Sequence, residues 1–137
     1  MSTYYLDTSA LVKRYVDETG SSWLQTTLET PPRPSIILVQ LAIVEMTSAL
    51  MRRVREGAVS APEYTQIQNA FLSDCLGHYE LVAVVDDIIN KANRLLEEHP
   101  LRAYDAIHLA AAVVSNQALV ARDLPPLLFL SANDRLN

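Results

Sequence analysis

Three acidic residues stand inside apolar segments, where an ionised side chain needs a specific partner. Asp7 directly follows an apolar run at 4–6. Glu45 interrupts an apolar helical pattern at 41–50, and Asp105 lies among alanine and isoleucine residues. Burying a carboxylate is costly unless a cation or several hydrogen bonds compensate its lost hydration. The three acids are therefore the first candidates for a functional site.

The chemistry of such a site follows from its side-chain types. Carboxylates that converge raise one another's pKa unless a cation lies between them. Oxygen ligands without imidazole or thiolate favour Mg²⁺ or Mn²⁺, and the sequence has no Cys/His metal-binding cluster. If Asp7, Glu45 and Asp105 meet in the fold, the sequence predicts a divalent-metal site.

Each acid taken alone also fits a simpler structural role. Asp7 fits the N-cap of the helix that follows it. Glu45 fits a solvated position or a partner of Arg52, two turns later. Asp105 fits an ion pair with Arg102, three residues earlier. Only the combination of the three acids favours a metal site over these separate roles.

His108 lies three residues after Asp105 on the same predicted helix, within side-chain reach. A histidine there fits a general base. It also fits a buried histidine whose ring nitrogens are satisfied by hydrogen bonds, which is the commoner case. The sequence alone leaves both interpretations open.

Apolar residues alternate between short β-like runs and longer helical patterns. Ser60 and Glu63 form a capping box that opens one helix, and Gly57 ends the helix before it. Caps are also predicted at Ser21 and at the pair Asp86 and Asp87. Strands are predicted at 4–6, 35–38, 80–85 and 127–131, and helices at 10–16, 21–28, 39–57, 60–77, 86–99, 101–115 and 133–137.

This alternation, without a hairpin turn between strands, predicts a single domain at 1–137 with a three-layer α/β/α sandwich. Its central sheet is expected to be parallel, with four to five strands. Ligands of such open sheets bind at the carboxyl ends of the strands. Asp7 ends the first predicted strand and Asp105 lies near the start of a helix, so both are expected at that edge.

Composition and charge exclude several classes of protein. The net charge of −5 and the pI near 5.1 argue against nucleic-acid binding by overall charge. Arg52, Arg53 and Arg55 form a local cationic group that fits either phosphate contact or a solvated helix end. The single Cys75 is typical of a reducing compartment. Because no membrane span of roughly 20 apolar residues and no signal peptide is recognisable, we expect a cytoplasmic protein.

Three segments resemble the motifs of one known family. YLDTSALVK at 5–13, VEMTSAL at 44–50 and LRAYDAIHLA at 101–110 are similar to motifs of the PIN-domain ribonucleases, and more narrowly of VapC-like toxins from type II toxin–antitoxin modules. The three occur in the family's order and spacing. The resemblance implies a metal-dependent endoribonuclease that hydrolyses RNA phosphodiester bonds. It also implies a cognate antitoxin that holds the nuclease inactive, and a homodimer.

The resemblance also assigns roles to individual residues. Asp7 and Asp105 are expected to be the principal ligands of Mg²⁺ or Mn²⁺, and Glu45 to complete the ligand shell or orient the attacking water. Ser9 is expected to support the acidic site and to contact the substrate. The nearest cations by sequence, and hence the candidates for contacts to substrate phosphates, are Lys13, Arg14 and Arg102.

The chain departs from the family pattern after its last predicted strand. The family commonly carries a fourth acid there, in a Ser/Thr-Ala-Asp pattern, whereas this chain has Asn133 at that place. The amide oxygen of Asn133 can bind a hard cation or position a water, but it brings no charge. Asp134 is the substitute ligand if the turn shifts by one residue.

Two other functions stay compatible with the sequence. The missing fourth acid fits a catalytically weak PIN-fold protein that acts as a binding or scaffold module. Asp86 and Asp87, which follow a predicted middle strand, fit a receiver-like signalling module. That module needs a lysine after the last strand, and neither Lys13 nor Lys91 is there.

Overall fold

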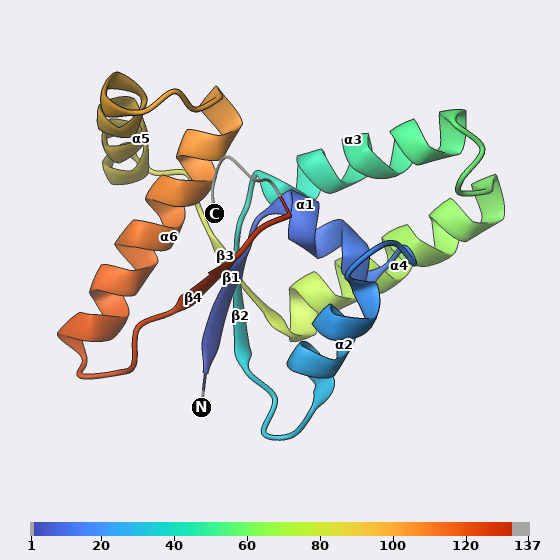
Figure 1. Cartoon of the computed structure of the whole chain (residues 1–137), viewed down its shortest axis with the longest axis horizontal. Helices are drawn as coiled ribbons and strands as arrows, with labels where there is room; N and C mark the ends of the chain where they lie inside the picture. The colour runs from blue at the N-terminus through green and yellow to red at the C-terminus, as the bar shows by residue number, and fades with distance from the viewer. Residues whose placement is uncertain (1, 133–137) are drawn as a thin grey trace.

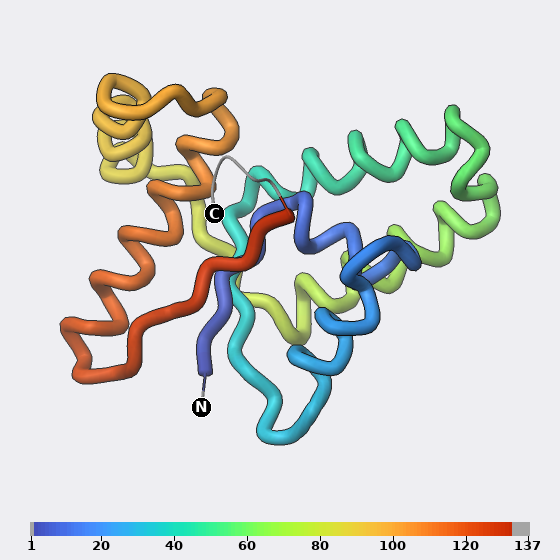
Figure 2. The backbone as a smooth tube through the Cα atoms, in the orientation of Figure 1, coloured from blue at the N-terminus to red at the C-terminus, as the bar shows by residue number. Residues whose placement is uncertain are grey.

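Four short runs of β-branched, aromatic and leucine residues pair as a parallel sheet in the computed structural model, which describes residues 2–132. The strand order is β3-β2-β1-β4. Figure 2 shows β1 and β4, from opposite ends of the sequence, running side by side. The strands are β1 (Thr3–Leu6), β2 (Ser35–Val39), β3 (Tyr79–Val82) and β4 (Leu128–Leu130).

Helices cover both faces of this sheet. The helices α1 to α4 lie on one side and α5 and α6 on the other (Figure 1). This arrangement confirms the predicted three-layer α/β/α sandwich. No helix within the described residues is long and apolar enough to cross a membrane. The helices are α1 (Thr8–Leu11), the 3-10 helix η1 (Val12–Arg14), α2 (Ser21–Glu29), α3 (Ala42–Arg55), α4 (Ala61–Gly77), α5 (Asp86–Glu98) and α6 (Ala103–Ala121).

Alternating side chains of the central strands fill two apolar cores. Leu6 and Leu38 belong to the core under α1 to α4, and Tyr5 and Val39 to the core under α5 and α6. All four side chains are fully buried. Since both faces of the sheet are covered, the central strands are apolar through almost their whole length. Asp7, the first residue after β1, is therefore the first charged side chain at the carboxyl end of this apolar strand.

The carboxyl ends of the strands form the edge at which the candidate site lies. The backbone N–H of Asp7 donates to the carbonyl oxygen of Leu130 at the end of β4 (3.2 Å). The helices α1, α3 and α6 all begin at this edge (Figure 1). Residues in their first turns are consequently brought close to the ends of β1 and β4.

Two predicted boundaries are wrong around α2 and α3. The sequence places Val39 at the start of a helix, whereas it ends β2 and pairs with Val82. Val39 fits the apolar pattern of the strand before it and also that of the helix after it, so the sequence does not fix the boundary between them. Ser21 is not the N-cap of α2, since Gly20 holds that position with a φ of +93°. The hydroxyl of Ser21 instead accepts from the backbone N–H of Glu18 (2.9 Å).

Other helices differ from the predicted ranges at their ends. The helix predicted at 10–16 is α1 followed by the tighter η1, and the helix predicted at 101–115 continues to the end of α6. Asp86 and Asp87 lie in the first turn of α5 but do not supply its N-cap. The positive end of the helix dipole still stabilises their negative charges. The helix predicted at 133–137 falls outside the described residues.

The connection between α3 and α4 follows its predicted signals. The hydroxyl of Ser60 accepts from the backbone N–H of Glu63, and the carboxylate of Glu63 accepts from that of Ser60, both at 3.2 Å. Gly57, just past the end of α3, has a φ of +80°, which a residue with a side chain rarely adopts. The capping box and the helix stop are both confirmed.

A polar cluster joins η1, α4 and β3. Tyr15 Oη donates to Asp74 Oδ2 (2.6 Å) and is hydrogen-bonded to Tyr79 Oη, which also accepts from Arg14 Nη1 (2.9 Å). Burial is the largest cause that raises the pKa of Tyr79 to about 12, and burial raises the pKa of Tyr15 as well. The folded protein therefore keeps both phenols neutral. The neutral phenol of Tyr79 therefore contributes to the stability of the folded protein. This contribution is complete below pH 10, the ordinary pKa of tyrosine, and is lost as the pH rises through about 12.

Tyr79→Phe should therefore weaken the alkaline destabilisation of the protein. We expect a lower free energy of unfolding at about pH 8, because hydrogen bonds are lost, but a smaller decline as the pH rises from about 10 to about 12. Two pKa units limit the difference in decline to about 3 kcal/mol. Urea denaturation measures it, with the exposed Tyr104→Phe as the control. Equal declines in the wild type and Tyr79→Phe would contradict the burial of an ionisable phenol.

Candidate functional site

Asp7 is a buried carboxylate held by uncharged donors. It is the N-cap of α1, and Oδ1 accepts from the backbone N–H of Ala10 (3.0 Å) and the hydroxyl of Ser9 (2.7 Å). Oδ2 accepts from the hydroxyl of Ser131, after β4 (2.5 Å). Only 3% of Asp7 is exposed. The N-cap interpretation of Asp7 is therefore confirmed, and it accounts for one of the three hydrogen bonds.

Ser9 connects Asp7 to the end of β4. Its hydroxyl accepts from the backbone N–H of Ala132 (2.9 Å) while donating to Asp7. An ionised carboxylate offers about four lone-pair positions, and the described donors use three of them on Asp7. Asp7 thus keeps capacity for one further ligand, and the structure brings Ser9 to this acid as the sequence predicts.

Glu45 lies in the first turn of α3 and approaches the same edge. Its Oε1 accepts from the hydroxyl of Thr8 (3.0 Å), the residue next to Asp7, and lies 2.5 Å from Nε2 of His108. The side chain of Glu45 is 22% exposed. These contacts replace the alternative pairing with Arg52 and join Glu45 to the segment that carries Asp7.

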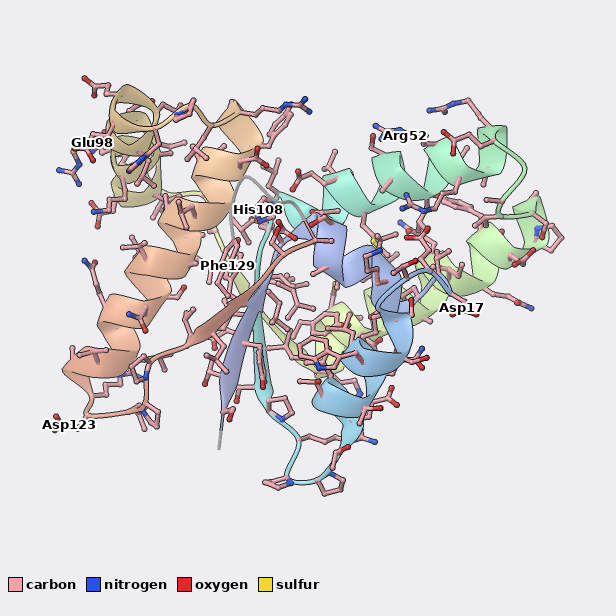
Figure 3. All side chains as sticks on the ribbon, in the orientation of Figure 1. Asp17, Arg52, Glu98, His108, Asp123 and Phe129 are labelled. Atoms are coloured by element: carbon pink, nitrogen blue, oxygen red, sulfur yellow. The ribbon has the colours of Figure 1, made fainter. Side chains whose placement is uncertain are left out.

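His108 faces the sheet from α6 (Figure 3) and is 2% exposed. Its Nδ1 lies 2.9 Å from the hydroxyl of Tyr5 in β1, and its Nε2 contacts Glu45. The ring of Tyr5 in turn stacks on Phe129 of β4, with ring centroids 5.4 Å apart. The interpretation of His108 as a buried, hydrogen-bonded histidine is confirmed.

The hydroxyl of Tyr5 stays neutral in this environment. Burial raises the pKa of Tyr5, and the negative charges of Asp7 and Glu45 raise it further. A backbone hydrogen bond with Val39 acts in the opposite direction. The net effect is a phenol that remains protonated beside two carboxylates, and so remains a hydrogen-bond donor.

Asp105 lies in the first turn of α6, where the positive end of the helix dipole favours an acid. It is half-buried, one turn before His108. Within residues 2–132, no group of three or more His, Cys, Asp or Glu side chains is arranged so that it could hold a metal ion. Convergence of Asp7, Glu45 and Asp105 on one ion therefore stays a prediction. Asn133 and Asp134 lie outside the described residues.

The donor chemistry at this edge nevertheless fits a hard divalent cation. The acids Asp7 and Glu45 and the nearby hydroxyls offer only oxygen atoms. Both ring nitrogens of His108 are already engaged by protein atoms. Oxygen-only sets of this kind suit Mg²⁺ or Mn²⁺ rather than zinc or copper.

The predicted phosphate-binding cations occupy three different settings. Lys13 Nζ lies 3.7 Å from a carboxylate oxygen of Glu18. Arg14 is directed to Tyr79, with its guanidinium 5.5 Å from the centre of that ring, and not to the acids. Arg102 is exposed at the N-cap position of α6, close in sequence to Asp105. Lys13 also lines a hollow together with Ser131, the donor to Asp7.

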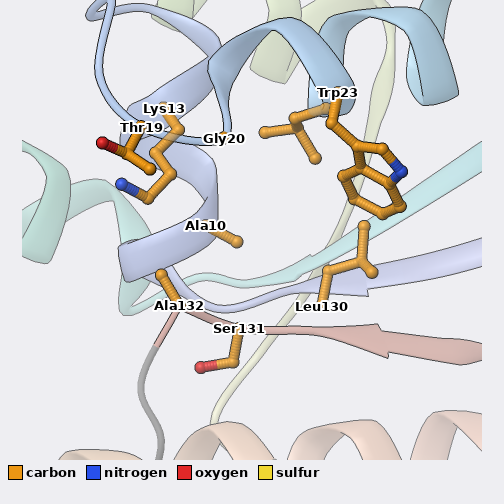
Figure 4. A pocket seen from close by; sticks show the side chains of 9 residues that line it. Ala10, Lys13, Thr19, Gly20, Trp23, Leu130, Ser131 and Ala132 are labelled. Carbon is orange, nitrogen blue, oxygen red and sulfur yellow. The ribbon is translucent and has the colours of Figure 1, made fainter.

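Two hollows flank the acids. A groove of about 340 Å³ is lined by Thr8, by α3 residues from Glu45 to Arg52, and by Tyr104 of α6. A second hollow, of about 220 Å³, lies between η1, α2 and the end of β4. Figure 4 shows side chains around the second hollow, among them Ser131, the donor to Asp7.

Sequence reasoning missed Tyr5, Thr8 and Ser131 as parts of the site. Tyr5 and Asp7 are two residues apart, so they point to the same side of β1, a signal that was readable in the sequence. Ser131 reaches Asp7 only because β4 pairs with β1. No local sequence pattern predicts the pairing of β1 with β4.

Comparisons with known proteins support the fold. Structures with this fold include VapC20 of Mycobacterium tuberculosis, described as a sarcin–ricin loop cleaving toxin (14% identity, TM-score 0.66, 97% of this chain and 92% of that chain). A toxin–antitoxin complex from Klebsiella pneumoniae matches at 22% identity and TM-score 0.60, over 95% of this chain and 86% of that chain. VapBC2 from Rickettsia felis, bound to promoter DNA, matches at 13% identity and TM-score 0.62, over 96% and 99%.

The sequence itself matches a known family over most of its length. No curated protein matches it at a significant level. The family model described as the PIN domain, however, matches residues 4–124. That range contains Asp7, Glu45 and Asp105, together with every helix of the described fold. The chain belongs to the PIN domain family.

Proposed function

We propose that this protein is a metal-dependent endoribonuclease that hydrolyses RNA phosphodiester bonds, and that it is the toxin of a toxin–antitoxin pair. The observation that carries the proposal is the buried Asp7, linked through its neighbour Thr8 to Glu45 at the ligand-binding edge of a PIN fold. Toxins and toxin–antitoxin complexes among the structures of similar fold support it. The proposed partners are RNA, a cognate antitoxin and a second copy of the chain, in the cytoplasm.

The uncharged donors around Asp7 support a cation at this site. Ser9, Ala10 and Ser131 orient the carboxylate of Asp7 without cancelling its charge. A lysine or arginine in the same place would neutralise the carboxylate and make it a structural ion pair. Within the described part of the chain, the carboxylate of Asp7 is 3% exposed and is held by hydroxyl and backbone N–H groups, which favours a positive ligand.

We assign Asp7 and Asp105 as the principal ligands, with Glu45 completing the shell or orienting the attacking water. Asn133 or Asp134 is the proposed fourth ligand. When bound, Mg²⁺ or Mn²⁺ supplies a water of lowered pKa and neutralises charge on the leaving oxygen. The protein's own part is to hold Asp7 through Ser9 and Ser131 in one orientation, so that little rearrangement is needed when substrate binds.

The groove along α3 is the proposed path of the RNA strand. It begins at Glu45 and is bordered by Arg52 and by Tyr104, whose side chain is 59% exposed. An exposed aromatic ring can stack on an unpaired base, and a guanidinium can contact a phosphate at two oxygens. Because the net charge of the protein is −5, local contacts of this kind have to supply most of the attraction.

The alternative of a catalytically weak binding or scaffold protein makes a different prediction. Such a protein would bind RNA or an antitoxin through the same groove but would not cleave RNA. Membership of the PIN domain family favours both of these functions over a receiver-like signalling module. A nuclease assay with added metal separates the nuclease from the scaffold.

Asp7→Asn and Asp105→Asn are expected to reduce RNA cleavage by at least about 100-fold, because each removes a charged ligand of the metal. Cleavage by the wild type is expected to stop in excess chelator and to return with Mn²⁺ or Mg²⁺. Initial rates on a labelled structured RNA measure both effects. The exposed Asp87→Asn serves as a matched control that keeps its rate.

Thermal unfolding of each variant separates a lost ligand from lost structure. Full activity of either Asp7→Asn or Asp105→Asn would remove that residue from the site. Cleavage that persists in chelator would contradict metal dependence.

Arg52→Ala and Tyr104→Ala are expected to raise KM for RNA by about 5- to 10-fold each while kcat changes little, since both side chains line the groove and neither is a proposed metal ligand. Steady-state kinetics on an oligoribonucleotide measures the two constants. Arg94→Ala, an exposed arginine on α5, is the control. If Arg52→Ala and Arg94→Ala behaved alike, the RNA would take another path.

A further inference from the structure

A continuous chain of hydrogen bonds connects the sheet core to Glu45. It runs from the hydroxyl of Tyr5 to Nδ1 of His108 (2.9 Å), and from Nε2 of His108 to Oε1 of Glu45 (2.5 Å). Tyr5 and His108 are 0% and 2% exposed. The chain joins three elements, β1, α6 and α3, that no local sequence pattern connects.

The direction of each hydrogen bond follows from the chemistry of the groups. An ionised Glu45 can only accept, so the proton between it and His108 belongs to Nε2. Tyr5 Oη lies 2.9 Å from Nδ1, and a phenol carries its proton at neutral pH. Its hydroxyl can then donate to Nδ1, which places the proton of the ring on Nε2. Tyr5 thereby selects the tautomer that His108 needs in order to hold Glu45.

We propose that His108, held in one tautomer by Tyr5, is a positioning residue that fixes the carboxylate of Glu45 for its part in the metal site. His108 and Thr8 both donate to Oε1, so Oε2 is the oxygen that is presented to a cation or to its water. This inference rests on the proposed nuclease function.

The burial of His108 separates this role from that of a general base. Both ring nitrogens are engaged by side chains, and the ring is 2% exposed, so the imidazole has no direct path to a water at the phosphate. Glu45 has three rotatable bonds and a partly exposed side chain. Free rotation would therefore lower the population of the rotamer that can bind the cation. If His108 holds this orientation before metal binds, less side-chain entropy of Glu45 is lost on binding, and the affinity for the metal is higher.

The first test reads the tautomer directly, without metal or RNA. Nitrogen-15 NMR of the metal-free protein is expected to show His108 with a protonated Nε2 and an unprotonated Nδ1. Tyr5→Phe, which removes only the hydroxyl, is expected to mix the two tautomers. The exposed His78 and His99 provide internal references. A protonated Nδ1 together with an unprotonated Nε2 in the wild type would overturn the proposal.

The second test asks whether His108 acts through Glu45. We expect His108→Leu to weaken Mn²⁺ binding by about 10- to 100-fold in calorimetric titration without RNA, and His108→Gln, which keeps an N–H donor, to recover part of that affinity. In a Glu45→Gln background, His108→Leu is expected to cause little further loss. An equal loss in both backgrounds would overturn the proposal, since His108 would then act independently of Glu45.

The two tests keep failure of the proposal apart from failure of the proposed function. If Mn²⁺ did not bind to the folded wild type, the metal-dependent function would fail, and the tautomer spectrum would still decide whether His108 donates to Glu45. If Mn²⁺ bound and RNA were cleaved, but His108→Leu folded and retained full Mn²⁺ affinity, only the positioning role would fail. Thermal unfolding of His108→Leu, His108→Gln and Tyr5→Phe confirms that each variant is folded.

Discussion

The burial of a charged carboxylate at Asp7 is the constraint on which the rest of the site depends. Its exposed fraction is 3%, so the protein must replace nearly all of the hydration that the carboxylate has in water. The donors come from the start of α1 and from Ser131 after β4. Asp7 and Ser131 are 124 residues apart in the chain. The site is consequently complete only when the first and last strands of the described fold are paired.

Two kinds of acid coexist in this fold, and their partners distinguish them. Glu18 accepts two hydrogen bonds from the guanidinium of Arg53, which lowers the pKa of Glu18 and closes a structural ion pair. Asp7 instead receives hydrogen bonds from hydroxyl and backbone groups. Uncharged donors fix the orientation of an acid and leave its charge uncancelled. That difference is the physical basis for proposing a cation beside Asp7 and not beside Glu18.

The alternation of apolar patterns was enough to predict the parallel three-layer fold. The three acids in apolar surroundings indicated a candidate site, whose assembly around one ion stays a prediction. Val39 was misassigned because an apolar residue between a strand and a helix satisfies both periodicities. The contact of Ser131 with Asp7 could not be predicted locally, since it depends on the pairing of β4 with β1. His108 was ambiguous for the same reason, because only the packing of α6 on the sheet determines what surrounds its ring.

We propose that Asp7, Glu45 and Asp105 bind one divalent cation at the carboxyl edge of the sheet. A crystal structure of the protein grown with Mn²⁺, with anomalous diffraction data, would locate this cation. We expect an anomalous peak at about 2.1 Å from carboxylate oxygens of Asp7 and Asp105, with Oε2 of Glu45 bound to the ion or to its water. An edge without a peak at saturating Mn²⁺, or an ion bound by other residues alone, would contradict it.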